Sequence, residues 1–249
     1  MSDKKIYSET TVTLPSKGII YDDKSVPADI SIRGMTTREE KILYSSAGGD
    51  VFSKILKNCV TTPEDFDTSN LIAADEMFLI VQLRIVTFGP NYKVSATCPH
   101  CGHTDTYQVN LSDFDVEYLP EDFKEPIEVK LPQSGDTLSL RLLRNSDNQM
   151  LDKFIKKRAK QFNLPIKEVE YDCRNAKYIT AVNGKPIDFV DAIEYFQSMV
   201  SMDSMRMQTA LGDVRVGLDT TANVMCTACR EEFDFTTPIT REFFRPVIK

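Results

Sequence analysis

Apolar residues recur at helical spacing in the first ninety residues of the chain. The first helix should follow two overlapping capping boxes, Thr36 with Glu39 and Thr37 with Glu40, because each pairs a capping hydroxyl with an acid three residues later. The last helix is apolar on nearly every side, so we expect its neighbours to bury it. The pattern predicts three helices: from the capping boxes to Gly48-Gly49, from Asp50 to about Val60, and over residues 71–88.

Strand signals flank and separate these helices. Residues 7–14 are rich in β-favouring side chains, and residues 30–33 alternate between apolar and polar, so both segments are expected to be strands. Gly18 lies in a turn between them and is expected at a positive φ. Farther along, residues 127–131 and 137–142 alternate around a turn signal, which predicts a hairpin.

The stretch after that hairpin is predicted to be mostly helical. One helix should run from about Ser146 to Phe162, and two more should begin at the capping residues Asp188 and Asp203. Residues 167–181 are ambiguous, because their pattern suits either a strand or the end of a helix.

Two further segments share one layout, in which a cysteine pair lies between two short strand candidates. Cys98 and Cys101 lie between residues 92–97 and 104–109, and Cys226 and Cys229 lie between residues 221–225 and 231–236. A gap of two residues lets both sulfurs of one tight turn face the same metal ion. Four thiolates suit tetrahedral zinc and leave no open coordination position, so we expect a structural zinc ion.

The 124 residues between Cys101 and Cys226 mean that this zinc would join distant parts of the chain. Two unrelated pairs of free thiols are the alternative. His103 could replace one cysteine as a ligand, but four thiolates already saturate the metal, and His100 should face solvent. Two cysteines stand alone, and we expect both to be buried apolar residues: Cys59 and Cys173.

These elements together predict an α+β fold, in which two β-hairpin knuckles form a split zinc ribbon. A helical N-terminal segment precedes the ribbon, and a mixed α/β insertion separates its two halves. The expected units are an N-terminal β segment with helices at 1–90, the split ribbon at 91–110 and 221–240, the insertion at 111–220, and a C-terminal tail at 241–249.

Composition and charge argue against several classes of function. The net charge is −7 and the isoelectric point is near 5.0, which makes nucleic acid an unexpected partner. Both histidines lie in the first cysteine turn, and no nucleotide-binding or hydrolase motif is present, so neither an enzyme nor a small-molecule substrate is expected. We expect no membrane span and no signal peptide, and a reducing cytoplasm in which the cysteines bind metal or stay free.

Two segments are candidate partner-binding sites. A basic run on the helix at 146–162 includes Lys153, Lys156 and Lys157, and it could meet nucleic acid or an acidic protein, or be a solvated helix face. Phe243 and Phe244 lie near the C-terminus, where chain ends fray unless they are anchored. These rings should dock either onto the protein's own core or into a partner.

Several segments, in this order and spacing, resemble the baseplate hub and baseplate assembly family of contractile-tailed, T-even-like bacteriophages. The resemblance extends from about residue 8 to 246. It rests on Leu14-Pro15-Ser16-Lys17-Gly18-Ile19-Ile20-Tyr21, Met35-Thr36-Thr37-Arg38-Glu39-Glu40, Leu83 to Gly89, both cysteine pairs, and Glu242-Phe243-Phe244-Arg245-Pro246. Arg230 of the second cysteine turn departs from Gly102 of the first, which puts the geometry of that turn in doubt.

The resemblance implies a non-enzymatic component of the tail baseplate, or a factor that assembles its hub. Other baseplate or tail proteins would be its partners. It would be found in the virion tail, or in the host cytoplasm during assembly. The alternative is a zinc-ribbon accessory factor that binds nucleic acid, and its binding should weaken steeply with added salt.

Overall fold

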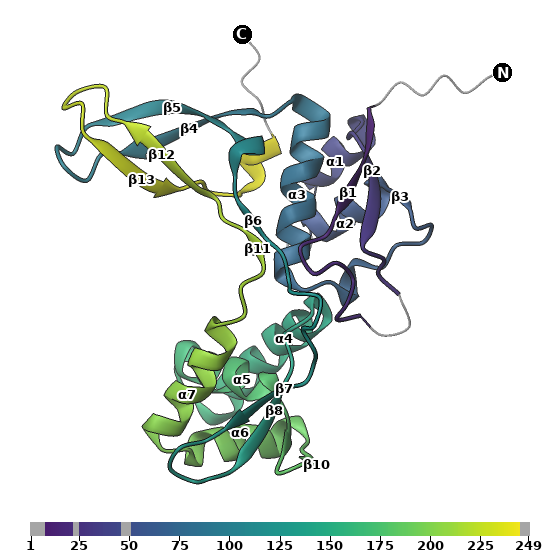
Figure 1. Ribbon diagram of the computed structural model, residues 1–249, viewed down its shortest axis with the longest axis vertical. Coiled ribbons are helices and arrows are strands. Elements are labelled where there is room, and N and C mark those ends of the chain that lie inside the picture. The colour runs from purple at the N-terminus through teal and green to yellow at the C-terminus, as the bar shows by residue number, and fades with distance from the viewer. Residues whose placement is uncertain (1–7, 22–24, 46–50, 245–249) are drawn as a thin grey trace.

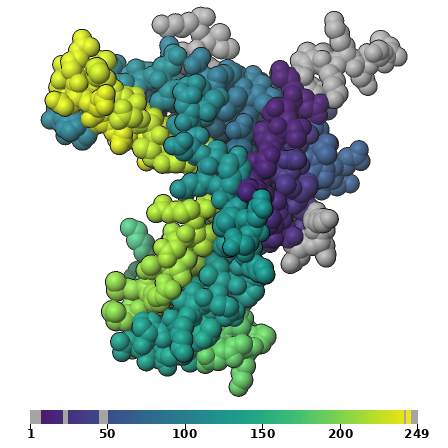
Figure 2. Space-filling model, viewed as in Figure 1, coloured from purple at the N-terminus to yellow at the C-terminus, as the bar shows by residue number. Residues whose placement is uncertain are grey.

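The computed structural model describes residues 8–21, 25–45 and 51–244, and they form a mixed α+β structure. Figure 1 shows a body built from the first ninety residues, a second body of helices at the opposite end, and two β-hairpins that project sideways from the first body. The space-filling view shows the same elongated outline, with the hairpins and the second body on either side of a concave flank (Figure 2).

The first body contains a three-stranded antiparallel sheet of order β1-β2-β3 and three helices. The strands are β1 (Glu9–Thr13), β2 (Asp29–Arg33) and β3 (Val60–Thr62), and the helices are α1 (Thr37–Ser45), α2 (Val51–Cys59) and α3 (Ala73–Phe88). The predicted strands and helices of this region are therefore confirmed. The predicted stop at Gly48-Gly49 and the start at Asp50 lie outside the described residues.

Local signals explain two of these features. Gly18 has a φ of 70°, and a Cβ there would lie 2.7 Å from the carbonyl oxygen of Val26, so only glycine fits the turn. At the start of α1, the Glu39 carboxylate accepts the backbone N–H of Thr36 at 2.8 Å. It also pairs with Arg33 at 3.0 Å, so one acid fixes both the helix start and its contact with β2.

Helix α3 is buried on most sides, as its apolar pattern predicts, and it also buries two charges. The Asp75 carboxylate accepts the backbone N–H of Ser16 at 3.0 Å and the hydroxyl of Tyr21 at 2.5 Å. Burial raises the pKa of Asp75 above its usual range, although the hydrogen bonds from Ser16 and Tyr21 oppose that shift. This carboxyl ties the glycine turn to α3.

Arg84 ties the C-terminal segment to the same helix. Its guanidinium donates to the carbonyl oxygens of Phe243 at 2.9 Å, Gly89 at 3.0 Å and Asn91 at 3.4 Å. The segment Arg241–Phe244 forms a 3₁₀ turn whose two phenylalanine rings are buried in the first apolar core. Of the two docking sites considered for these rings, the structure places them on the protein's own core.

The second body contains a four-stranded antiparallel sheet of order β10-β9-β8-β7 and four helices. Its apolar core is separate from the first and extends from Val129 to Ala210. The ambiguous stretch at 167–181 resolves into most of a helix followed directly by a strand. The elements are β7 (Ile127–Lys130), β8 (Thr137–Leu140), α4 (Asn145–Phe162), α5 (Ile166–Tyr178), β9 (Ile179–Val182), β10 (Lys185–Pro186), α6 (Phe189–Ser198) and α7 (Ser201–Gly212).

One predicted helix cap is confirmed and another is wrong. Asp188 caps α6 by accepting the backbone N–H groups of Val190 and Asp191. Asp203, however, lies inside the first turn of α7, which begins at Ser201. Its carboxylate instead accepts the N–H groups of Gln133 at 2.8 Å and Ser134 at 2.9 Å, because the β7–β8 turn presents these two donors to it.

The two bodies are joined by paired backbone and by side chains that include Arg144 and Asn145. Strand β6 (Val116–Glu117), which leads into the second body, pairs antiparallel with β11 (Gly217–Leu218), which leads out (Figure 1). Arg144 donates to the carbonyl oxygen of Ile20 at 2.9 Å and pairs with Glu125 at 2.7 Å. None of the described helices combines the length and the apolar composition that a membrane-spanning helix requires.

Candidate metal centre

The four paired cysteines lie at the tips of the two projecting hairpins, whose strands are confirmed. The first hairpin consists of β4 (Asn91–Thr97) and β5 (Thr104–Asn110), and the second of β12 (Thr221–Met225) and β13 (Glu232–Thr236). Figure 1 shows them packed beside each other although more than a hundred residues separate them in the sequence.

The two cysteine turns have the same backbone hydrogen bonds. In the first, Cys98 donates its N–H to His103 at 2.9 Å and accepts the N–H of Gly102 at 2.9 Å. In the second, Cys226 donates to Glu231 at 2.9 Å and accepts from Arg230 at 3.1 Å. Each turn therefore holds its two cysteines in an equivalent arrangement.

Arg230 does not alter the second turn. Its φ is 68°, close to the 74° of Gly102 at the equivalent position, so both residues occupy the left-handed region. A non-glycine residue costs about 1–2 kcal/mol in this conformation. The sequence put the geometry of the second turn in doubt. The structure shows that Arg230 adopts the same left-handed conformation as Gly102 despite that cost.

This equivalence gives a prediction at the two turn positions. Gly102→Ala should destabilise the protein by about 1 kcal/mol, because a Cβ at this φ is strained although no neighbouring atom lies within 4 Å of it. Arg230→Gly should stabilise it by about 0.5–1 kcal/mol through relief of the same strain. Urea unfolding of both variants measures the two changes, and equal losses in both would contradict the account.

The four sulfur atoms converge. The Sγ atoms of Cys98 and Cys229 are 3.8 Å apart, those of Cys101 and Cys226 are 3.7 Å apart, and all four lie within 4.8 Å of one another. A tetrahedral ion with bonds of about 2.3 Å to sulfur requires edges of about 3.8 Å between sulfurs. A disulfide needs about 2.05 Å, so these cysteines are free thiols at metal-ligand spacing.

The electrostatics of the cluster also suit a cation. Backbone N–H groups of Cys229 and Ala228 lower the pKa of the Cys226 thiol to about 6. The backbone N–H of Glu231 lowers the pKa of Cys229, but burial and hydrogen bonds with the neighbouring thiols raise it to about 12. Four thiolates so close together repel one another, and a divalent ion would remove that repulsion.

A small apolar core of its own supports the cluster. The Tyr107 and Phe233 rings meet edge to face with centroids 5.6 Å apart, and they pack with Ala96, Cys98 and Cys226. The Tyr107 hydroxyl is buried, and no described residue meets hydrogen-bond geometry with it. Burial and the neighbouring Cys226 thiol raise its pKa, which places this orphaned donor beside a candidate ligand sulfur.

The residues around the sulfurs link the two hairpins directly. The hydroxyl of Thr227 donates to the Asp105 carboxylate at 2.7 Å, across the interface between the turns. His103 lies 3.9 Å from the same carboxylate, and both His100 and His103 are exposed. Among the described residues, the candidate metal cluster consists of the four cysteines and does not include His103.

The remaining candidate residues lie far from this cluster. Lys153, Lys156 and Lys157 are exposed on α4, and Cys59 and Cys173 are buried in the two main cores. Sequence reasoning missed Tyr107, Asp105 and Thr227. Alternation along residues 104–110 does predict that Tyr107 shares a face with Val109, but the partners across the interface come from the second hairpin.

Comparisons with known proteins bear on the family of this chain. Searches among curated proteins and among solved structures find no match. The sequence model of the family described as T4 bacteriophage base plate protein matches residues 7–245, which is nearly the whole chain. That match includes both cysteine turns and the buried C-terminal phenylalanines. The chain therefore belongs to the T4 bacteriophage base plate protein family.

Proposed function

We propose that this protein is a non-enzymatic component of the hub region of a phage tail baseplate, either a structural part or an assembly factor. We further propose that a structural zinc ion at Cys98, Cys101, Cys226 and Cys229 makes the two hairpins a split zinc ribbon. The observation that carries this proposal is the convergence of four sulfurs, from two turns far apart in the sequence, in a member of a baseplate family.

A closed site suits a mechanical role better than a chemical one. Four thiolates complete a tetrahedral shell, so the ion would have no position for water or substrate. Such a site forms only when both hairpins are assembled, so metal binding contributes to folding. A part that must fit into a larger assembly gains from surfaces that are fixed before it binds.

The apolar clusters support a division of the chain into units. We propose an N-terminal unit, the split ribbon and an insertion, because the buried apolar residues form three separate clusters. Leu111, Phe114 and Leu119 pack with the first cluster, so the insertion unit is proposed to begin after about residue 120. The split ribbon would then be assembled from both sides of the insertion, and so would the first cluster, which includes Phe243 and Phe244.

Membership in a baseplate family implies a place in the virion tail and other tail proteins as partners. The finer assignments, to the hub region and to the finished virion or the host cytoplasm during assembly, are part of the proposal. A structural baseplate family also indicates a structural role, which favours a protein without enzymatic activity.

A complementation experiment tests the proposed role. A phage that encodes this protein and carries a deletion of its gene should fail to complete baseplates, and the wild-type gene supplied in trans should restore plaques. The Cys98→Ser gene should restore at most about 1% of them, because the unsupported ribbon loses its fold. Normal baseplates in the deletion phage would contradict the role. Mass spectrometry of purified particles then separates a virion component from an assembly factor.

A further inference from the structure

Tyr107 is buried between the two cysteine hairpins with a hydrogen-bond donor that it does not use. Its ring packs edge to face against Phe233 and shares a small apolar core with Cys98 and Cys226. Tyr107 is only 7% exposed, and no described residue meets hydrogen-bond geometry with its hydroxyl. A buried hydroxyl without an acceptor is costly, so its presence at this position requires an explanation.

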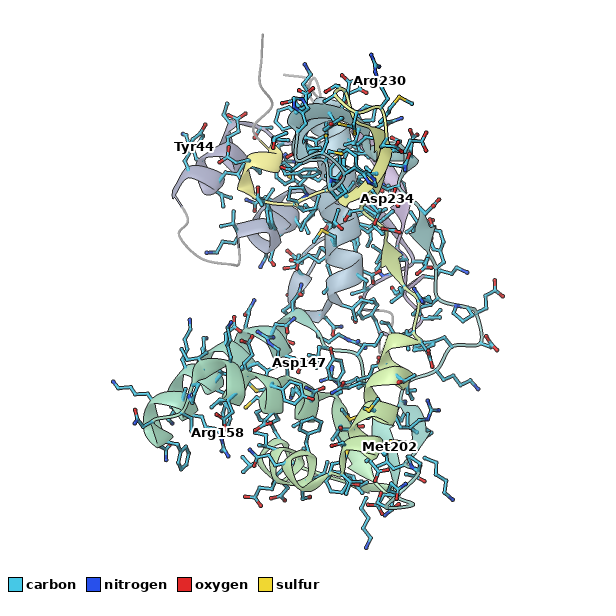
Figure 3. The ribbon with its side chains drawn as sticks, turned by 90° about the vertical axis from the view of Figure 1, so that its left-hand side faces the viewer. Tyr44, Asp147, Arg158, Met202, Arg230 and Asp234 are labelled. Atoms are coloured by element: carbon cyan, nitrogen blue, oxygen red, sulfur yellow. The ribbon has the colours of Figure 1, made fainter. Side chains whose placement is uncertain are left out.

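This hydroxyl lies beside the Cys226 thiol. Burial raises the pKa of Tyr107 most, and the neighbouring Cys226 thiol raises it further, which requires the two groups to lie close together. Tyr107 belongs to β5 in the first hairpin, whereas Cys226 lies at the tip of the second, so their contact crosses the interface between the hairpins. In Figure 3, Arg230 marks the tip of the second hairpin, at the opposite end of the molecule from Arg158 in the second body.

A cysteine sulfur becomes a good acceptor when it loses its proton. The sulfur of a neutral thiol accepts hydrogen bonds weakly, whereas a thiolate accepts a charge-assisted hydrogen bond. Metal ions bind the thiolate form. Zinc binding would therefore turn the Cys226 sulfur into the acceptor that the Tyr107 hydroxyl lacks.

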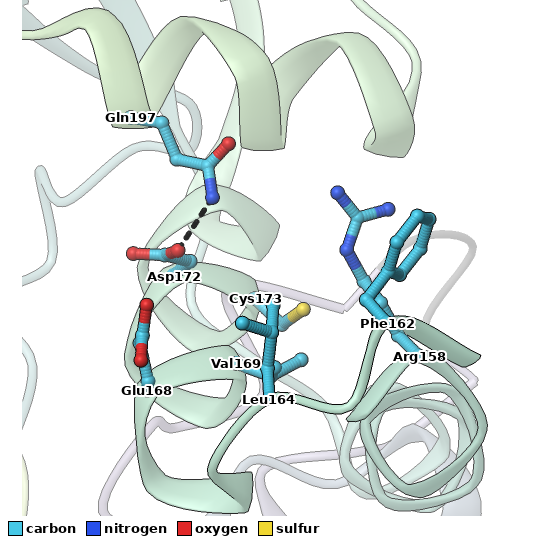
Figure 4. A pocket seen from close by; sticks show the side chains of 8 residues that line it. All are labelled: Arg158, Phe162, Leu164, Glu168, Val169, Asp172, Cys173 and Gln197. Atoms are coloured by element: carbon cyan, nitrogen blue, oxygen red, sulfur yellow. Dashed lines mark hydrogen bonds between the residues drawn. The ribbon is translucent and has the colours of Figure 1, made fainter. Parts of the chain in front are cut away.

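The surroundings of Cys226 already favour a thiolate. Backbone N–H groups of Cys229 and Ala228 lower the pKa of its thiol. Cys173 provides the contrast, because it lines a pocket of about 130 Å³ beside Val169 (Figure 4), and burial raises the pKa of its thiol. The Tyr107 hydroxyl would add a side-chain donor to the backbone donors that surround Cys226.

The two hairpins differ at the position of this hydroxyl. Tyr107 and Phe235 each lie six residues after the second cysteine of their own turn. Tyr107 pairs with Val94 and Phe235 with Ala222, so the two rings occupy equivalent places in the two hairpins. A phenyl ring is therefore accepted at this position, and packing alone does not account for the hydroxyl of Tyr107.

We propose that Tyr107 is a positioning residue of the metal centre, whose hydroxyl donates a hydrogen bond to the metal-bound Cys226 thiolate across the hairpin interface. This bond would withdraw negative charge from the sulfur, which lessens the repulsion among the four thiolates, and it would orient the Cys226 side chain. The proposal rests on the structural zinc ion proposed above and names the residue of the opposite hairpin that supports it.

Zinc competition on the purified full-length protein tests the proposal. Tyr107→Phe keeps the ring and removes only the hydroxyl. We expect its affinity for zinc, measured against a chromophoric chelator, to fall by about tenfold, as is usual when a hydrogen-bond partner of a metal ligand is lost. Tyr92→Phe is the matched control, because Tyr92 is on the same hairpin but packs against Phe243 in the first core. The control should bind zinc as tightly as the wild type, and equally tight binding by Tyr107→Phe would overturn the proposal.

Two further measurements separate a bond to sulfur from an effect on packing. With Co²⁺ in place of zinc, the sulfur-to-metal charge-transfer absorption of Tyr107→Phe should move to longer wavelength, because a hydrogen bond stabilises the sulfur electrons that this transition removes. In urea, the variant should unfold earlier than the wild type when zinc is present, and at the same concentration after chelation. An unshifted band, or an equal loss of stability with and without zinc, would assign Tyr107 a packing role and overturn the proposal.

Failure of this role and failure of the zinc centre give different results. If the wild type binds neither Zn²⁺ nor Co²⁺ through sulfur, the metal centre itself is wrong and Tyr107 has no ligand to support. If the wild type binds both ions and Tyr107→Phe binds them equally well with the same absorption, the zinc centre stands and only the role of Tyr107 is wrong.

Discussion

Cys98→Ser is expected to release the metal and separate the two cysteine hairpins. Structural zinc contributes on the order of 10 kcal/mol in small zinc-binding domains. Here it would hold the ribbon together, because the apolar core under the sulfurs comprises only a few side chains. Serine keeps the size of the residue but binds zinc far less well than a thiolate. We expect the backbone amides of residues 91–110 and 221–236 to lose their protection from hydrogen exchange.

The cores of the two larger bodies should survive this substitution, because neither includes the four metal-ligand candidates. Cys173→Ala is the matched control. It removes a buried thiol from the second body but leaves all four clustered sulfurs, so the variant should retain its metal. Protection of the hairpin amides that is the same in Cys98→Ser as in the wild type would contradict the proposed role of the ion.

Phe243→Ala is expected to lower the free energy of unfolding by about 3–5 kcal/mol, the usual loss for a fully buried phenylalanine. Its ring is 0% exposed. It meets Tyr92 edge to face with centroids 4.9 Å apart, and it packs against Phe244 at 5.5 Å. The truncation leaves a cavity beneath the C-terminal turn. It should also weaken the hydrogen bond that the Arg84 guanidinium donates to the backbone carbonyl oxygen of residue 243.

Denaturant unfolding of Phe243→Ala beside Phe162→Ala provides the comparison. Both variants remove the same side chain, but Phe162 is half exposed, so its loss should cost less than about 1 kcal/mol. Similar losses in the two variants would mean that the C-terminal turn is not anchored in the core as described. Because stability is the only readout, the comparison needs no partner protein.

The elements of the cysteine hairpins were predictable because their signals are local. Each turn is indicated by a two-residue gap between cysteines and by alternating apolar and polar residues on either side. The convergence of the sulfurs is a long-range fact, but the repeated layout pointed to it. Arg230 misled the prediction about its turn, since a sequence does not reveal when a strained φ is tolerated.

Other features depended on partners that no local pattern identifies. Asp75 and Arg84 interrupt an apolar helix, and no local pattern shows what would satisfy their charges. Both are buried, because donors and acceptors from distant segments satisfy them. Aspartate often caps helices, but the carboxylate of Asp203 accepts a backbone N–H from a turn seventy residues away in sequence. Phe243 and Phe244 were predicted to dock, and only the tertiary structure decides where.

Metal analysis of the purified full-length protein tests the central claim most directly. Elemental analysis by mass spectrometry, combined with thiol titration of the native chain, should find one zinc ion per chain and four thiols that react only after chelation. Protein that contains no zinc, and whose four hairpin cysteines titrate without chelation, would contradict the account.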